Sequence, residues 1–151
     1  MNNTKIKILF SEDDEFLVDI YKNKFEKAGF DVRSVQNLNS IISEAKDFQP
    51  DFIFFDLLYD GEPAFEVLKQ IKNDDETKNI PVVALTNLRK EEDRKKAMEA
   101  GALDYVSKLE TSLEKMIAVV EEKLQLKICP NCHERAKIVE GKCNLCGTKI
   151  E

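Results

Sequence analysis

The stretch Asp51-Phe52-Ile53-Phe54-Phe55-Asp56-Leu57-Leu58 determines the fold that the sequence predicts. Its central residues, Phe52 to Phe55, are all apolar strand-formers, and Pro50 precedes the stretch. A strand without polar alternation is typically buried on both faces, as in parallel sheets. Asp56 then lies where the carboxyl edge of the sheet opens to solvent, and ligands bind at that edge in open α/β sheets. Taken alone, Asp56 also fits an ordinary aspartate at the start of a loop.

The composition describes one soluble domain with a small appendage. The chain has 151 residues, of which 42% are hydrophobic and 34% charged, and its formal net charge is −6. That length and apolar content suit a single core. Acidic charge argues against non-specific DNA binding by the whole chain, because the phosphate backbone attracts positive charge. No apolar run approaches membrane-spanning length and no signal peptide opens the sequence, so we expect a cytoplasmic protein without membrane contact.

Strand-like and helix-like segments alternate five times along the first 126 residues. The predicted strands are 5–10, 30–35, 52–55, 80–85 and 104–107, and the helices are centred on 15–28, 41–48, 65–71, 90–100 and 113–124. Asn37 or Asn39 is expected to cap the second helix, and Thr111-Ser112-Leu113-Glu114 matches a capping box for the last. Short connections between alternating elements predict a doubly wound parallel α/β sheet with helices on both faces.

Polar side chains follow four of the predicted strands. Glu12 and Asp13 follow the first, Asp56 the third, Thr86 the fourth and Lys108 the last. Right-handed crossovers place all these ends on one edge of the sheet. Neighbouring carboxylates repel one another, and a hard divalent cation such as Mg²⁺ relieves that repulsion. Such a set can surround a phosphoryl group on a carboxylate, because phosphoryl transfer needs mainly positioning and charge neutralisation.

The order of these residues resembles the CheY-like receiver domain of two-component response regulators. The local motifs agree: Ile-Leu-Phe-Ser-Glu-Asp-Asp-Glu-Phe-Leu, Ile-Phe-Phe-Asp-Leu-Leu, Pro-Val-Val-Ala-Leu-Thr and Ala-Gly-Ala-Leu-Asp-Tyr-Val-Ser-Lys. The resemblance covers residues 4–126 and implies a flavodoxin-like five-stranded sheet with strand order 2-1-3-4-5. It also implies a phosphodonor, either a sensor histidine kinase or a small molecule.

The resemblance implies a role for each residue at the strand ends. Asp56 would be the phospho-acceptor, Thr86 would turn its hydroxyl toward the phosphoryl group and Lys108 would pair with that group. Tyr105 falls at the position of the family's aromatic switch. Four residues would hold Mg²⁺, with Glu12 acting through water and Leu58 through its backbone carbonyl: Glu12, Asp13, Asp56 and Leu58.

The sequence departs from the family pattern in three places. Leu109 stands where a cis proline usually follows the lysine, and a cis bond before Leu costs about 2.5–4 kcal/mol, so a trans link or an altered loop is expected. Asp60 takes the place of a proline, and Pro63-Ala64 replaces Asp-Gly. Leu58 and Leu88 occupy the two positions thought to tune hydrolysis, and neither orients an attacking water. We therefore expect a long-lived phospho-aspartate.

All four cysteines lie in two Cys-x-x-Cys pairs near the end of the sequence, Cys129-Pro-Asn-Cys132 and Cys143-Asn-Leu-Cys146. Two such turns complete a tetrahedral Zn²⁺ site, and this arrangement resembles compact zinc ribbons. Redox dithiols or disulfides are the alternative. A complete Cys₄ set makes His133, the sole histidine, a bystander. The resulting division is a receiver over residues 1–126 and a zinc-ribbon tail over 127–151.

Three functions compete. The leading hypothesis is a phosphorylation switch, not an enzyme, whose output is binding of a downstream protein, with a phosphorylation-dependent homodimer as one form. The second is a transcription regulator whose ribbon binds nucleic acid, which is less favoured because the charges of the tail nearly cancel once four thiolates and one Zn²⁺ are counted. The third is a phosphatase-like enzyme with an aspartate nucleophile, but Leu58 stands where its second aspartate belongs.

Overall fold

Five parallel strands form the main sheet of the computed structural model, which describes residues 5–59, 62–87, 90–108 and 110–150. The strands are β1 (Lys7–Ser11), β2 (Asp31–Val35), β3 (Phe52–Phe55), β6 (Val82–Thr86) and β7 (Asp104–Ser107). Their spatial order is β2-β1-β3-β6-β7. Because β4 and β5 lie outside this sheet, the strands of the sheet run 2-1-3-4-5, and the predicted order is confirmed.

The central strand is buried on both faces, as its composition predicts. All four residues of β3 have exposed fractions of 0%, and β3 pairs in parallel with β1 and β6. Phe52 and Phe54 pack into the apolar cluster on one face, whereas Ile53 and Phe55 pack into the cluster on the other. Burying each such side chain stabilises the fold by about 1.5–3 kcal/mol, so the strand that ends at Asp56 is a rigid support.

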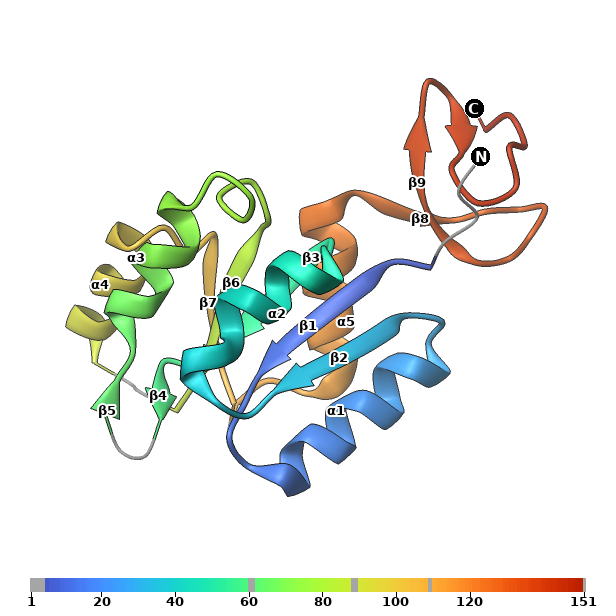
Figure 1. The fold of residues 1–151 in the computed structure, drawn as a ribbon. Helices are drawn as coiled ribbons and strands as arrows, with labels where there is room; N and C mark the ends of the chain where they lie inside the picture. Colours follow the sequence, from blue (N-terminus) through green and yellow to red (C-terminus); the bar gives the residue numbers. More distant parts are fainter. Residues whose placement is uncertain (1–4, 60–61, 88–89, 109, 151) are drawn as a thin grey trace.

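Helices cover both faces of the sheet (Figure 1), and the doubly wound prediction is confirmed. Helices α1 (Glu15–Lys27) and α5 (Leu113–Leu124) pack on the face that carries Phe54. Helices α2 (Ile41–Phe48), α3 (Phe65–Asn73) and α4 (Glu91–Glu99) pack on the face that carries Phe55. No helix among the described residues is both long and apolar enough to cross a membrane.

The helix caps differ in detail from the sequence prediction. Asn37 caps the short 3₁₀ turn η1 (Leu38–Ser40) by accepting from the Asn39 amide, and α2 begins only after it, at Ile41. Helix α5 is capped by Ser112, whose hydroxyl accepts from the Lys115 amide, one residue later than a capping box starting at Thr111 requires. Neighbouring polar residues compete for one cap, and tertiary packing of the helix decides between them.

The segment after Asp56 forms a small β-hairpin where a plain loop was expected. Strand β4 (Leu58–Tyr59) pairs in antiparallel fashion with β5 (Glu62–Pro63). Asp60, which stands where the family has a proline, is outside the described residues. The Ala64 amide donates to the Leu57 carbonyl at 2.7 Å, so Leu57 and Ala64 are a hydrogen-bonded pair of residues in the antiparallel ladder. By the alternation of an antiparallel ladder, Leu58 and Pro63 then form a non-hydrogen-bonded pair, a position that proline tolerates.

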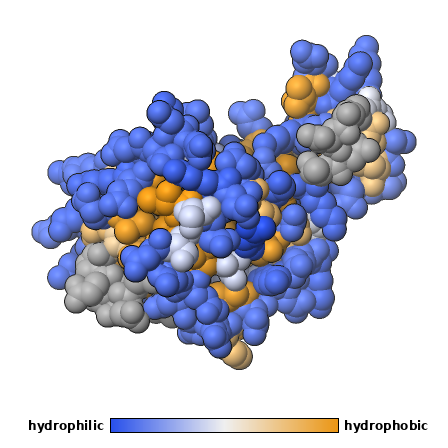
Figure 2. Space-filling model, viewed as in Figure 1, coloured by the Kyte–Doolittle hydropathy of each residue, from blue (hydrophilic) through white to orange (hydrophobic). Residues whose placement is uncertain are grey.

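The end of the chain forms a separate three-stranded sheet, here called the ribbon (residues 126–150). Its strands are β8 (Leu126–Ile128), β9 (Arg135–Val139) and β10 (Lys142–Cys143), in the order β10-β9-β8. Strand β8 was not predicted from the sequence. The ribbon projects from one end of the main sheet (Figure 1), and the surface seen in the same view is mostly hydrophilic (Figure 2).

Candidate functional site

Four of the five side chains predicted at the strand ends line one cavity at the carboxyl edge of the main sheet: Glu12, Asp13, Asp56 and Lys108. The cavity measures about 250 Å³. Ligand oxygens of Glu12, Asp13 and Asp56 all lie within 4.8 Å of one another. Glu12 and Asp56 are almost fully buried, with exposed fractions of 1% and 2%, whereas Asp13 is exposed. Three carboxylates at such distances repel one another unless positive charge accompanies them.

Lys108 supplies that positive charge. Its Nζ donates to Asp56 Oδ2 at 2.7 Å and also forms an ion pair with Glu12 Oε2. The Lys108 amide donates to the Thr86 carbonyl at 3.0 Å, which fixes the lysine to the end of β6. The lysine therefore reaches the Asp56 carboxylate without a proline after it, although Leu109 itself lies outside the described residues.

Burial changes the proton affinities of this cluster. Desolvation raises the pKa of Glu12 from 4.5 to about 7; the hydrogen bond from Lys108 opposes this rise and the charge of Asp56 adds to it. Desolvation also raises the pKa of Asp56, against hydrogen bonds from Lys108 and from the Leu58 amide. At neutral pH the two buried carboxyl groups thus share a single ammonium group, and Glu12 is partly protonated.

The residues that line the cavity differ in part from those predicted from the sequence. Thr86 is fully buried at the end of β6 but is not among the described residues that line the cavity. Asp14, Leu17 and Asn87 do line it. Asn87 directly follows Thr86, and Asp14 follows the predicted acidic pair, so adjacency to the motifs was the available signal. Asp14 also caps α1 by accepting from the Phe16 amide at 2.9 Å.

The donors in this cavity fit a divalent cation. Glu12, Asp13 and Asp56 together carry up to three negative charges against the one positive charge of Lys108, and Mg²⁺ prefers such oxygen donors. The Leu58 amide donates to Asp56 Oδ1 at 3.0 Å, and the hairpin register leaves the Leu58 carbonyl out of the β4–β5 ladder. Leu58 lines the same cavity, so its carbonyl is a further oxygen donor there.

The four cysteines of the ribbon come together as the sequence predicts. Sγ of Cys129 lies 3.6 Å from Sγ of Cys146, and Sγ of Cys132 lies 3.9 Å from Sγ of Cys143. A disulfide requires about 2.05 Å. Four sulfurs at about 2.3 Å from a tetrahedral Zn²⁺ stand roughly 3.8 Å apart. The spacing matches a metal centre rather than two disulfides.

The two cysteine turns have matching backbone geometry. In each, the first cysteine Sγ accepts from the amide two residues later, at 3.4 Å, with Asn131 and Leu145 as donors. His133 and Gly147 occupy equivalent positions, both with positive φ (62° and 82°) and both donating to the carbonyl of the first cysteine. His133 is exposed and follows the cysteine set rather than joining it.

The chemistry of the thiols also fits a cation. Hydrogen bonding between the Cys146 sulfur and the hydroxyl and backbone of Thr148 lowers the pKa of Cys146 to about 5. Although the Glu134 amide lowers the pKa of Cys132, burial and the neighbouring thiols raise it to about 12. Four thiols this close do not all ionise alone, whereas a divalent metal ion binds them as thiolates.

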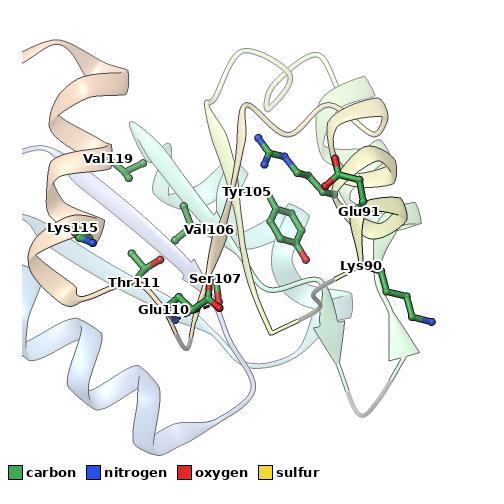
Figure 3. Close-up of a pocket in the computed structure, with 10 residues that line it drawn as sticks. Lys90, Glu91, Tyr105, Val106, Ser107, Glu110, Thr111, Lys115 and Val119 are labelled. Carbon is green, nitrogen blue, oxygen red and sulfur yellow. Dashed lines mark hydrogen bonds between the residues drawn. The ribbon is translucent and has the colours of Figure 1, made fainter.

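A second, larger cavity of about 550 Å³ lies over α4, β7 and α5. Figure 3 shows the Tyr105 ring between β7 and α4, with charged side chains around the opening. The lining combines both signs of charge with a few apolar groups: Lys90, Glu91, Arg94, Tyr105, Val106, Ser107, Glu110, Thr111, Lys115 and Val119.

Comparison with known proteins assigns the main unit to a family. A family model described as the response regulator receiver domain matches residues 8–121. The chain belongs to the response regulator receiver family. Receivers of this family are phospho-acceptor switches in two-component signalling, and histidine kinases phosphorylate them. The resemblance predicted from the strand ends is confirmed.

Several relatives are transcription regulators by name. The DNA-binding dual master transcriptional regulator RpaA of Synechocystis is 32% identical over 119 residues, which cover 79% of this chain and 49% of the relative. The phosphate regulon transcriptional regulatory protein PhoB of Escherichia coli is 31% identical over 102 residues, covering 68% and 44%. The polar-differentiation response regulator DivK of Brucella anthropi is 28% identical over 101 residues, covering 67% and 82%. This chain thus spans about half the length of the first two relatives.

Solved structures support the fold of the receiver. A CheY-like receiver protein from Methanospirillum hungatei superposes with a TM-score of 0.73 at 19% identity, covering 81% of this chain and 95% of that one. A two-component response regulator from Clostridium difficile gives a TM-score of 0.73 at 24% identity, covering 80% and 97%. At these identities the likeness is one of fold alone.

Proposed function

We propose that this chain is a phosphorylation switch whose phospho-acceptor is Asp56, with a protein partner as its output. The observation that carries the proposal is the position of the Asp56 carboxylate. It is buried at the end of the central strand, where it lines the cavity, is hydrogen-bonded to Lys108 and lies within 4.8 Å of two further carboxylates. This arrangement supplies the nucleophile, a cation site and a positive charge for the phosphoryl group.

Each residue has a defined task in the transfer. An Asp56 oxygen forms the new bond to phosphorus, while the bond from phosphorus to the kinase histidine nitrogen, or to the acetate oxygen of acetyl phosphate, breaks and its electron pair leaves with the donor. Lys108 then pairs with the phosphoryl group, and the Thr86 hydroxyl donates to it. Mg²⁺ held by Glu12, Asp13, Asp56 and the Leu58 carbonyl would neutralise charge on the phosphoryl oxygens.

Intact-mass analysis with acetyl phosphate tests this proposal. We expect a single phosphoryl adduct in buffer containing Mg²⁺, its loss on removal of Mg²⁺, and its complete loss in Asp56→Asn. Asp75→Asn is the matched control, because Asp75 is an exposed carboxylate whose partner is the surface residue Lys78. An adduct that persists in Asp56→Asn, or the lack of any adduct in the unmodified chain, would overturn the assignment.

The phospho-aspartate should be long-lived because the cavity has an apolar side chain at Leu58. Leu58→Asn introduces a group that orients water, and we expect it to accelerate loss of the adduct roughly tenfold or more. The measurement is the decay of the adduct mass after the donor is removed. Leu17→Asn is the control, since Leu17 lines the same cavity from α1. Rapid decay that Leu58→Asn leaves unchanged would contradict this expectation. Leu88, the other tuning position, is outside the described residues.

The cavity over α4, β7 and α5 is the proposed partner surface. Tyr105 lies in its lining, and Lys108 is three residues further along the chain, so a change at the phosphoryl group has a short route to this face. Its mixed charges suit a protein surface of complementary charges, including a second copy of the chain. We also propose that the chain divides into a receiver over residues 1–126 and a zinc-ribbon tail over residues 127–151, which follows the receiver in the sequence.

The alternative is that the ribbon binds nucleic acid, as the name of the DNA-binding relative RpaA suggests. Two basic side chains of the ribbon, Arg135 and Lys137, already form ion pairs with receiver carboxylates, which reduces the positive charge available to a phosphate backbone. We therefore favour a protein partner. A salt-dependent mobility shift of labelled DNA or RNA by the full chain would favour the alternative.

A further inference from the structure

The ribbon contacts the receiver at the end of the sheet opposite the phospho-acceptor cavity. One side chain, Arg135 of β9, contacts three receiver groups there. Its Nε donates to Glu121 Oε2 of α5 at 2.9 Å, and a terminal guanidinium nitrogen donates to the Ala28 carbonyl after α1 at 2.5 Å. The guanidinium carbon lies 5.6 Å from the centre of the Phe30 ring. A planar guanidinium suits such a combination of carboxylate, carbonyl and ring.

Lys137, two residues further along the same strand, makes a second attachment. Its Nζ donates to Asp51 Oδ1 at 2.9 Å, and the other Asp51 oxygen accepts from the Lys7 amide at 2.9 Å. Asp51 immediately precedes the central strand β3. Opposite Lys137 in the ladder stands Leu126, which is buried in the apolar cluster of α1 and α5. The contact therefore includes the end of α1, helix α5 and the start of β3.

The opposite face of β9 belongs to the cysteine centre. Side chains alternate along a strand, so Arg135 and Lys137 face the receiver while Ala136 faces the other way. Ala136 has an exposed fraction of 0% and packs with Cys129 and Cys143. A 25-residue unit buries too little apolar surface to hold β9 by itself, so the metal centre has to hold it.

We propose that β9 couples the zinc centre to the receiver: the metal holds Arg135 and Lys137 in position, and their receiver contacts in turn hold the metal centre closed. The inference rests on the proposed Zn²⁺ occupancy of the four cysteines and is independent of phosphorylation. Arg135 borders a cavity of about 310 Å³ that residues of α1 and α5 also line, so β9 is attached there through a few polar groups, whereas Leu126 of β8 packs into the apolar cluster. The ribbon therefore stabilises the end of the receiver formed by α1 and α5 in a zinc-dependent way. The face over α4 and β7 remains available to partners.

The test compares Arg135→Ala with Lys142→Ala in the full chain. Lys142 is an exposed lysine of β10 that forms no hydrogen bond or ion pair with the described part of the receiver, so it controls for loss of charge. A zinc-selective chelator removes the metal in buffer of constant Mg²⁺ concentration. The rate of zinc loss is measured from the absorbance of a second, chromogenic chelator. We expect Arg135→Ala to lose zinc on the order of fivefold faster than Lys142→Ala, as a coupling of about 1 kcal/mol implies.

The second readout is the thermal midpoint of the receiver, followed by its helical circular dichroism. Chelation should lower this midpoint in the unmodified chain and in Lys142→Ala, and should change it much less in Arg135→Ala. Glu121→Gln, which keeps the ribbon sequence intact, should reproduce the Arg135→Ala result. Equal rates of zinc loss in Arg135→Ala and Lys142→Ala would overturn the coupling. A thermal midpoint that chelation does not change in the unmodified chain would overturn it as well. Acetyl phosphate labelling of Asp56 reports separately on the proposed function.

Discussion

Replacing Lys108 by Met is expected to destabilise the Mg²⁺-free protein by about 3–5 kcal/mol at pH 8. The side chain of Lys108 is 10% exposed, and those of its partners Glu12 and Asp56 are 1% and 3% exposed. Removing the ammonium group leaves two buried carboxylates without their counter-charge. Breaking a buried ion pair costs more than the pair itself contributes, because the remaining charge stays out of water.

The loss of stability in Lys108→Met should increase as the pH rises. The pKa of Glu12 in the folded protein is about 7, above its ordinary value of 4.5, so the folded state binds more protons than the unfolded state between these values. Stability from protonated Glu12 is fully present below pH 4.5 and is lost as the pH rises through 7. Without Lys108 the pKa of Glu12 rises further, so the variant should approach the unmodified protein near pH 5 and fall well below it at pH 8.

Urea unfolding at pH 5 and pH 8, with and without Mg²⁺, measures these differences. Mg²⁺ should recover much of the loss at pH 8, because a cation that binds only the folded state stabilises it. Lys78→Met is the control: its ion pair with Asp75 is exposed, and such pairs contribute about 0–1 kcal/mol. An equal loss at both pH values would show that Lys108 acts through packing rather than through charge.

The parts of the structure that local sequence controls were predictable. Four consecutive apolar strand-formers between Pro50 and Asp56 indicated a strand buried on both faces, and each of them is fully buried. A strand this apolar has to be central, which placed Asp56 at the open edge of the sheet. Cys-x-x-Cys spacing likewise sets the geometry of each cysteine turn within four residues, so the approach of the four sulfurs followed from sequence alone.

Features that depend on distant partners were not predictable. The β4–β5 hairpin has two residues in each strand, too few to show a period, and Pro63 argued against a strand. Strand β8 is a three-residue run whose pairing partner, β9, had to be known first. The Arg135 contact with the Ala28 carbonyl spans 107 residues of sequence, and no local pattern distinguishes this arginine from a solvated one. Tertiary contacts decide each of these cases.

Replacing Cys143 by Ser is expected to abolish zinc binding and unfold the ribbon. Cys143 is 2% exposed and its Sγ lies 3.9 Å from that of Cys132. Removing one thiolate opens a tetrahedral site whose binding free energy in small zinc modules is roughly 10–16 kcal/mol, more than the apolar contacts of so short a segment supply. Native mass spectrometry should show loss of one zinc ion per chain, and hydrogen exchange should show loss of protection across β9 and β10.

His133→Asn is the matched control for this loss. His133 lies beside Cys132, but it is exposed and its φ of 62° suits asparagine, so zinc and exchange protection should both persist.

If the cysteines instead formed disulfides, non-reducing mass analysis of the unmodified chain would show the loss of two hydrogens per bond and no zinc. Zinc retained in Cys143→Ser would contradict a four-thiolate centre. Because β9 carries Arg135 and Lys137 on its other face, this variant should also lower the thermal midpoint of the receiver, a consequence that a ribbon independent of the receiver would not have.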